Sequence, residues 1–143
     1  MAILRSTPEF QPHEVLIAEE LIDAFLNSPE ASGYRVLVAD TSGSVAGYVC
    51  YGEAPLTRST WDVYWIAVDR ARRGGGVGKT LMAGAEQDIK ASGCRLVVIE
   101  TSGTASYNST RRFYAAIGYS EVANIADYYD IGDGLVILVK RLG

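Results

Sequence analysis

The sequence predicts a mixed α/β (α+β) fold, with flanking helices on a largely antiparallel central sheet that contains one parallel β-α-β unit. Three observations predict it. Residues 34–68 hold three segments rich in β-branched and aromatic residues, a glycine-rich loop and a helical repeat follow over residues 73–92, and further β-rich segments lie within residues 95–141. The chain has 143 residues, so we expect a single domain over residues 1–143.

The first predicted elements are a helix and a pair of strands. Apolar residues recur at helical spacing over residues 12–28, with acidic residues between them, which predicts an amphipathic helix. Residues 34–39 and 45–51 are predicted strands. Residues 41–44, Thr-Ser-Gly-Ser, have turn chemistry, so the two strands should form a hairpin.

A β-α-β unit is predicted after the hairpin. Residues 61–68 give a strong strand signal. Apolar residues at every fourth position from Val77 to Ile89 predict a helix that ends near Ser92, with Gly93 as its C-terminal cap. Residues 95–100 form a short β-rich run. A strand, loop, helix and strand in this order makes the two strands parallel.

The C-terminal part is predicted to hold one short helix and two strands. Residues 109–117 are helical in pattern, and Gly118 closes the helix. Residues 119–125 and 135–141 have the composition of strands. Residues 126–134, which are rich in Asp and Tyr, are expected to form a linker between them.

Composition argues against several classes of partner. The formal net charge is −4, so the chain lacks the overall basic character of a nucleic-acid-binding protein. No apolar run approaches the ~18 residues of a membrane helix, and no signal peptide is visible, so we expect no membrane partner. Cys50 and Cys94 lie in apolar runs and are expected to be reduced, buried thiols of a cytoplasmic protein.

The glycine-rich loop, residues 73–80, has the chemistry of an anion site. Glycines let the backbone approach a ligand closely with its N–H groups turned inward, and the helix that follows presents its positive dipole end. Arg73 and Lys79 add positive charge. Two kinds of phosphate ligand are compatible with this pattern.

One ligand would be a nucleotide, because Gly78-Lys79-Thr80 matches the end of the P-loop motif. The match fails at the first glycine, where Arg73 stands. A basic spacer, residues 69–73, also separates the strand from the glycines, whereas a P-loop starts directly at the strand end. A P-loop nucleotide-binding protein is therefore the less favoured alternative.

The other interpretation uses the pattern R-x-x-G-x-G at Arg73, Gly76 and Gly78. An apolar strand precedes it, and Asn108, Arg112-Phe113-Tyr114 and Gly118-Tyr119 follow a helix and a strand later. Over residues 34–125 this arrangement resembles the GNAT superfamily of N-acetyltransferases. Arg70 and Arg72 depart from residues common in that family.

This resemblance implies an acetyltransferase that moves an acetyl group from acetyl-CoA to an amine, by direct attack in a ternary complex. The loop would hold the pyrophosphate through backbone N–H groups, and backbone groups of the preceding strand would contact the pantetheine arm and the acetyl oxygen. The implied cofactor-binding residues are Ile66, Ala67, Val68, Arg73, Gly74, Gly75, Gly76, Val77, Gly78, Lys79 and Asn108. For Asn108, a helix-cap or turn role is an equal alternative. A non-catalytic acyl-CoA-binding sensor on the same fold is a second hypothesis.

The catalytic residues divide into an acid and a base. The resemblance implies that Tyr114 is the general acid, which would hydrogen-bond the departing sulfur and protonate it late. An alkyl amine has a pKa of ~10.4, so a base or a water chain must remove its proton. Glu53, Asp62 and Glu100 are the candidate bases. The only histidine, His13, lies far from the motifs, and no metal-ligand cluster occurs, so we expect no metal.

The acceptor is less well defined by the sequence. Acidic and aromatic residues gather in residues 127–130 and at Asp133, with Tyr64 and Tyr107 as expected neighbours. Such a group could receive a cationic amine, either a small molecule or a peptide or protein amine. A polar loop between two strands, or a homodimer contact, explains the same residues equally well.

Overall fold

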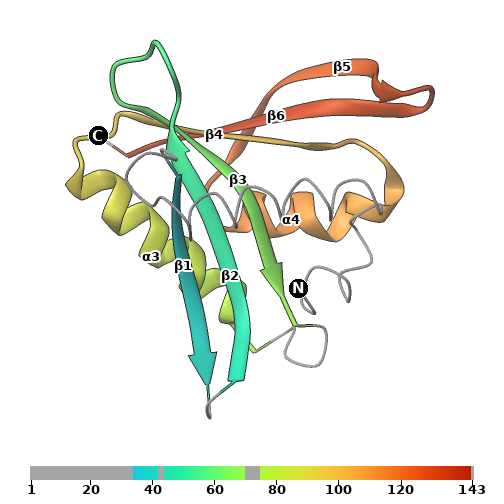
Figure 1. Cartoon of the computed structure of the whole chain (residues 1–143). Coiled ribbons are helices and arrows are strands. Elements are labelled where there is room, and N and C mark those ends of the chain that lie inside the picture. Colours follow the sequence, from blue (N-terminus) through green and yellow to red (C-terminus); the bar gives the residue numbers. More distant parts are fainter. Residues whose placement is uncertain (1–33, 42–43, 70–74, 143) are drawn as a thin grey trace.

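The computed structural model describes residues 34–41, 44–69 and 75–142. The predicted helix over residues 12–28, the residue His13 and the loop residues Arg70, Arg72, Arg73 and Gly74 lie outside the described residues. The described elements are β1 (Tyr34–Thr41), β2 (Ser44–Glu53), β3 (Thr60–Val68), α3 (Val77–Ala91), β4 (Leu96–Ser102), the 3₁₀ helix η2 (Ala105–Tyr107), α4 (Asn108–Ala116), β5 (Ser120–Asp130) and β6 (Asp133–Arg141) (Figure 1).

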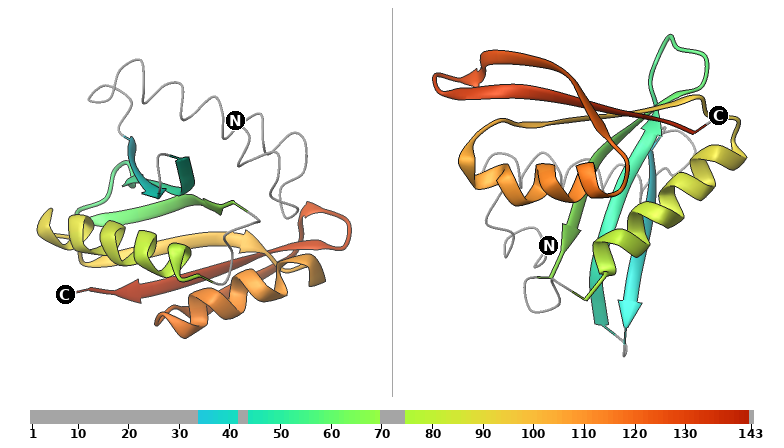
Figure 2. Two further views of the ribbon diagram at one scale, coloured as in Figure 1. Left: turned by 90° about the horizontal axis from the view of Figure 1, so that it is seen from below. Right: turned by 180° about the vertical axis from the view of Figure 1, so that it is seen from behind.

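The strands form one six-stranded sheet in the order β1-β2-β3-β4-β6-β5. Strands β3 and β4 are parallel, and the other neighbouring pairs are antiparallel. This confirms the predicted hairpin, the β-α-β unit and the mixed sheet. Helices α3 and α4 lie on the same face of the sheet, which we call the helix face (Figure 2). The other side of the sheet is called the opposite face.

The sheet divides in the middle. The β3–β4 ladder joins only Thr60–Val63 to Leu96–Ile99. Beyond it, β3 continues to Val68 in register with β2, and β4 continues to Ser102 in register with β6. The two halves of the sheet therefore diverge after Val63 and Ile99, as the ribbons of β3 and β4 show in Figure 1.

A bulge in β3 lies next to this point. On β2, Tyr51 pairs with Val63, whereas its neighbour Cys50 pairs with Trp65, so Tyr64 is an extra residue in β3. The bulge changes the alternation of side chains along the strand. A simple period of two, as read from sequence, cannot show such a change.

After the bulge, Ile66 and Val68 turn toward the helix face. Ile66 pairs with Val49, which is fully buried in the core, and paired residues share a face of the sheet. Both Ile66 and Val68 pack against the core cluster. Their side chains therefore serve packing, and only their backbone remains for a ligand.

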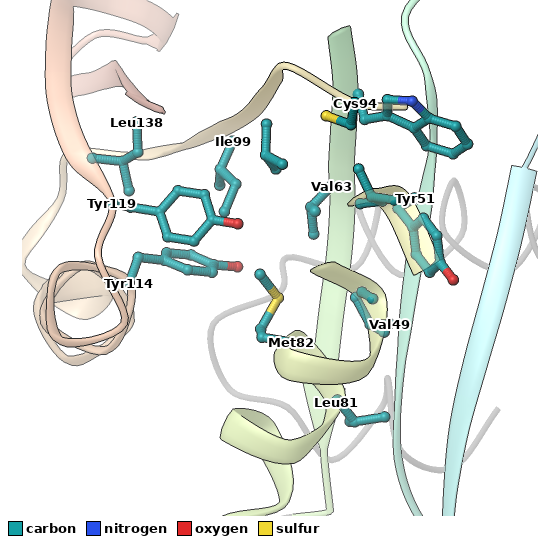
Figure 3. Close-up of a cluster of buried hydrophobic side chains, with 14 of the residues drawn as sticks. Val49, Tyr51, Val63, Leu81, Met82, Cys94, Ile99, Tyr114, Tyr119 and Leu138 are labelled. Carbon is teal, nitrogen blue, oxygen red and sulfur yellow. The ribbon is translucent and has the colours of Figure 1, made fainter. Parts of the chain in front are cut away.

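The main core lies between the sheet and the two helices (Figure 3). Helix α3 contributes Leu81, Met82, Ala85 and Ile89, and the region of α4 contributes Tyr114 and Tyr119. Burial of a large apolar side chain stabilises the fold by ~1.5–3 kcal/mol. The apolar periodicity of α3 therefore predicted the helix face that packs in the core. Both cysteines are free and buried, as expected.

The predicted linker over residues 126–134 is wrong. Strand β5 runs to Asp130 and β6 begins at Asp133, so only two residues connect them. The acidic side chains, which favoured a loop, accept hydrogen bonds in the turn: Asp130 Oδ1 from the Ile131 N–H (2.7 Å) and Asp127 Oδ1 from the Gly132 N–H (2.8 Å). A register irregularity with Asp127 at φ 59° allows the pairing to continue.

Within the described ranges, no helix is long and apolar enough to span a bilayer.

Candidate active site

The start of α3 has the features of an anion-binding helix terminus. Gly76 is the N-cap residue, with φ 83° and ψ 7°, a left-handed conformation that favours glycine. A Cβ at Gly76 would meet no atom within 4 Å, so the backbone conformation, and not lack of space, requires glycine here. No described side chain caps the helix, and its first turn holds no acidic residue. The first N–H groups of α3 are therefore suited to an external acceptor.

Gly78, in the first turn of α3, faces Phe113 of α4 and Val68 of β3. A Cβ at this position would lie 3.4 Å from Phe113 Cζ and 3.7 Å from Val68 Cγ2, which are ordinary contacts. Packing within the chain therefore does not require glycine at position 78. Gly75 and Lys79 are exposed beside it, whereas Val77 is partly buried against the core.

The backbone of Ile66, Ala67 and Val68 lies in the part of β3 that has left β4. These residues pair with β2, and the ladder to β4 ends before them, at Val63. Over this segment, β3 therefore does not pair with β4. This location agrees with the predicted role of backbone groups in β3.

Tyr114 is buried in α4, with only 5% of its surface exposed. Its ring packs on Phe113 (5.4 Å between centroids) and Tyr119 (5.8 Å). Figure 3 shows its hydroxyl pointing from α4 toward Met82. Burial raises the pKa of Tyr114 above its usual value, so the phenol stays neutral. In the described part of the chain, no group hydrogen-bonds this hydroxyl.

Asn108 begins α4 but does not cap it. The N-cap position is Tyr107, and no side-chain cap bond forms. The Asn108 Oδ1 atom instead accepts a hydrogen bond from Arg111 Nη2. Arg111 Nη1 also donates to the carbonyl oxygens of Ser102 (2.6 Å) and Thr104 (3.0 Å), which ties the end of β4 to α4. No sequence motif had indicated Arg111.

Asp62 and Glu100 lie on the opposite face. Asp62 pairs with Val98 on β4, and Glu100 is two residues beyond Val98, so these side chains share a face. Asp62 is half-buried and Glu100 is exposed. Burial raises the pKa of Asp62, and the nearby charge of Glu100 raises it further.

Glu53 is separated from this pair. It pairs with Trp61, which is buried in the core on the helix face. Paired residues share a face, so Glu53 projects to the other side of the sheet from Asp62. The structure thus brings together two of the three candidate bases.

Aromatic side chains surround Asp62 on the opposite face. The rings of Tyr34 and Tyr64 meet edge to face at 5.3 Å, and the rings of Tyr64 and Trp65 lie 6.2 Å apart. Burial, followed by the charge of Asp62, raises the pKa of Tyr64 to about 12. Tyr64 is therefore a neutral neighbour of the carboxylate.

The other residues predicted to bind the amine acceptor lie in or beside the β5–β6 hairpin. Tyr128 and Tyr129 pack edge to face on each other, 5.0 Å apart, and are exposed. Asp133 accepts a hydrogen bond from Ser102 Oγ (2.6 Å). The described contacts pair Tyr64 with Tyr34 and Trp65, and they do not join it to Tyr107, Tyr128 or Tyr129. In the described ranges, no group of three or more His, Cys, Asp or Glu residues could hold a metal ion.

No motif or periodicity indicated Glu86 and Lys140, which are 54 residues apart and form an ion pair of 2.7 Å beside Tyr119. Only the fold brings them together.

The geometry places two sets of groups on the two faces of a divided sheet. Tyr114 and the start of α3 belong to the helix face, and Asp62 and Glu100 belong to the opposite face. Within the described sheet, β3 and β4 separate next to Val63 and Ile99, between the two sets of groups.

Known proteins resemble this chain. Residues 2–119 match the family described as the Acetyltransferase (GNAT) family. An uncharacterised N-acetyltransferase of Methanocaldococcus jannaschii is 27% identical over 105 residues, which cover 73% of this chain. The chain spans 64% of the length of that relative.

Solved structures agree. A structure from Desulfovibrio desulfuricans, described as a candidate acetyltransferase of the GNAT family, has a TM-score of 0.96 and 39% identity, and the match covers 99% of this chain and 89% of that one. A candidate acetyltransferase of Salmonella typhimurium, solved with acetyl-CoA, has a TM-score of 0.77 and 18% identity, with coverage of 99% and 83%. The second likeness shows the fold alone. The family that the sequence motifs indicated is thus confirmed, and this chain belongs to the GNAT family of acetyltransferases.

Proposed function

We propose that this chain is an acetyl-CoA-dependent N-acetyltransferase whose acceptor is a small-molecule amine or a peptide or protein amine. The observation that carries the proposal is the divided sheet, with a neutral buried phenol on one face and two carboxylates on the other. Family membership supports the class of reaction.

The start of α3 fits the pyrophosphate of coenzyme A. Gly75 and Gly76 carry no side chain at the helix start, the first turn holds no acidic residue, and Lys79 adds a positive charge. Arg73 and Gly74 are predicted to complete this site from the preceding loop. When bound, acetyl-CoA would supply an acetyl group as a thioester, whose transfer to an amine forms an amide and releases the thiol.

The segment of β3 beyond its pairing with β4 is suited to polarise a carbonyl group. A backbone N–H group of the segment from Ile66 to Val68 would donate to the acetyl oxygen as negative charge develops on it. One such donor is typically worth ~3–4 kcal/mol of transition-state stabilisation. The main chain is held by pairing with β2, so little reorganisation is needed.

Asp62, with Glu100 beside it, is proposed to take up the proton of the amine, directly or through a water molecule. The raised pKa of Asp62 narrows the difference from an alkyl amine, whose pKa is ~10.4. The half-buried carboxylate and the rings of Tyr34 and Tyr64 also offer charge and cation–π attraction to a cationic acceptor.

Tyr114 is proposed to donate a hydrogen bond to the departing sulfur. A thiol has a pKa of ~8.5, and burial places the pKa of Tyr114 well above that. Complete proton transfer from Tyr114 to the sulfur is therefore uphill. Donation of a hydrogen bond by the phenol is not uphill, and it stabilises the leaving sulfur without ionising the phenol.

The test is amine-dependent release of free thiol from acetyl-CoA over a panel of acceptors: polyamines, amino acids, aminoglycosides and peptides with free N-termini. We expect thiol release and acetylated product in equal amounts with at least one class. Binding of acetyl-CoA without transfer to any acceptor would support the sensor alternative. Thermal stabilisation by ATP and magnesium, but not by coenzyme A, would support the P-loop alternative.

A further inference from the structure

The region behind Tyr114 contains a polar triad that joins three elements. Glu86 of α3 accepts a hydrogen bond through Oε2 from the Tyr119 hydroxyl (2.9 Å), and through Oε1 from Lys140 Nζ of β6 (2.7 Å). Lys140 Nζ also donates to the Ile117 carbonyl oxygen (2.8 Å), at the end of α4. The side chains of Glu86 and Lys140 are 15% and 26% exposed, and Tyr119 is 4% exposed.

The chain between α4 and β5 is shaped around this triad. Gly118 has φ 104°, and a Cβ there would lie 3.2 Å from Lys140 Cε. Lys140 thus reaches the C-terminal end of α4, where a cation is favourable. Removing two charges from water is costly, and apolar side chains of the same size often stabilise a protein equally well. Stability alone therefore does not explain the triad.

The triad contacts Tyr114 directly through Tyr119. The Tyr119 ring meets the Tyr114 ring edge to face at 5.8 Å, and the Tyr119 N–H donates to the Tyr114 carbonyl oxygen (3.0 Å). Figure 3 shows the two rings side by side, with their hydroxyls pointing the same way. Only the Tyr119 hydroxyl is held by a partner, because none of the described groups hydrogen-bonds Tyr114.

The orientation of Tyr114 must therefore come from the rings packed against it. We infer that Glu86, Tyr119 and Lys140 are positioning residues, which fix the Tyr119 ring and through it hold the Tyr114 hydroxyl in the direction needed at the leaving sulfur. The inference rests on the proposed role of Tyr114. It also links the helix that would bind the pyrophosphate to the residue that acts on the thiol, since Glu86 belongs to α3.

The chain offers a matched control on the same helix. Asp88 of α3 accepts a hydrogen bond from the buried Tyr51 hydroxyl (2.6 Å) and pairs with Arg35 (3.0 Å). This second triad has the same chemistry, with a tyrosine, a carboxylate and a cation. The described contacts of Tyr51 join it to Trp61 and Asp88, and not to Tyr114.

The experiment is a double-mutant cycle with Tyr119→Phe and Tyr114→Phe, with Tyr51→Phe as control. Tyr119→Phe should lower kcat roughly 10-fold, because small misplacements of a catalytic group are costly, and should leave the KM for acetyl-CoA unchanged. In the Tyr114→Phe background it should cause no further loss. Tyr51→Phe should lower Tm to a similar extent without changing kcat. Glu86→Gln, which keeps an acceptor for the Tyr119 hydroxyl, should lower kcat less than Tyr119→Phe.

Two results would overturn the inference: equal losses from Tyr119→Phe in both backgrounds, or an unchanged kcat in a folded Tyr119→Phe protein. A second readout does not depend on activity. The ¹³C resonance of the labelled Tyr114 ring should shift or broaden in Tyr119→Phe and stay in place in Tyr51→Phe, and an unmoved resonance in both would contradict the inference. If the parent protein acetylates no amine, the proposed function fails, while the resonance still decides whether Tyr119 positions Tyr114.

Discussion

Burial has the same effect on two titratable side chains of the candidate site, Tyr114 and Asp62. It raises the pKa of Tyr114 and of Asp62, and so favours the protonated form of each. For Tyr114 the consequence is a permanent hydrogen-bond donor. For Asp62 it is a carboxylate with more affinity for a proton, which is what an acceptor of the amine proton requires.

The substitution Tyr114→Phe tests the first of these effects. Because the hydroxyl has no partner among the described residues, its removal should change the free energy of unfolding by less than ~0.5 kcal/mol. The kcat should fall about 100-fold, the size of loss expected when one hydrogen-bond donor to developing negative charge is removed. Calorimetric titration should show unchanged affinity for coenzyme A. Full kcat with intact affinity would remove Tyr114 from the mechanism, and Tyr128→Phe, at an exposed tyrosine of the hairpin, is the control.

The pH dependence of kcat/KM tests the effect of burial on Asp62. Asp62 acts in its charged form, so the rate should decline as the pH falls through its raised pKa. Asp62→Asn should lower the rate and abolish this acidic limb. Glu100→Gln removes the nearby charge that raises the pKa of Asp62, so the limb should move to lower pH.

Glu53→Gln, on the other side of the sheet, should leave the limb in place. An acidic limb that survives in Asp62→Asn would place the base elsewhere. The raised pKa also means that charged Asp62 opposes folding above that pKa, so Asp62→Asn should be at least as stable as the parent at pH 7.

Among the elements, α3 combines a ligand site at its start with core packing along its length. Its described N-terminal turn lacks a capping side chain, whereas Leu81, Met82, Ala85 and Ile89 anchor it to the sheet. The two ends of the helix have glycines in the same left-handed conformation, Gly76 with φ 83° and Gly93 with φ 87°. A Cβ at either position would meet no atom within 4 Å.

These glycines provide a paired test. Gly76→Ala and Gly93→Ala should each destabilise the protein by ~1–2 kcal/mol, the usual cost of a left-handed conformation for alanine. Only Gly76→Ala should weaken coenzyme A, by roughly 10-fold, because its Cβ and the backbone strain lie at the proposed anion site. Chemical denaturation and calorimetric titration measure the two effects. Equal affinities of the two variants for coenzyme A would show that the start of α3 does not bind the cofactor.

The elements differ in how far sequence could predict them. Helix α3 was readable because a helical periodicity governs it, and the hairpin of β1 and β2 was readable because two β-rich segments flank a turn sequence. The far ends of β5 and β6 were not, since Asp127 and Asp130 have turn composition and are drawn into the hairpin by pairing across strands. The bulge at Tyr64 also depends on long-range pairing, and a local pattern does not record it.

At the scale of the molecule, the candidate site depends on the separation of β3 and β4, which divides the sheet. Motifs in the sequence pointed to Tyr114 and the start of α3, and the sequence offered Glu53, Asp62 and Glu100 as candidate bases. Only the register of β2, β3 and β4 separates Glu53 from the other two. The triad of Glu86, Tyr119 and Lys140 likewise exists only after α3, the end of α4 and β6 have come together.

The central claim is that donor and acceptor approach from the two faces and meet where β3 and β4 separate. A crystal structure of the protein with a non-reactive thioether analogue of acetyl-CoA tests it most directly. We expect the pyrophosphate at the start of α3, the sulfur within hydrogen-bonding distance of the Tyr114 hydroxyl, and the acetyl group open to the face that carries Asp62 and Glu100. A sulfur far from Tyr114, or an acetyl group closed off from that face, would contradict it.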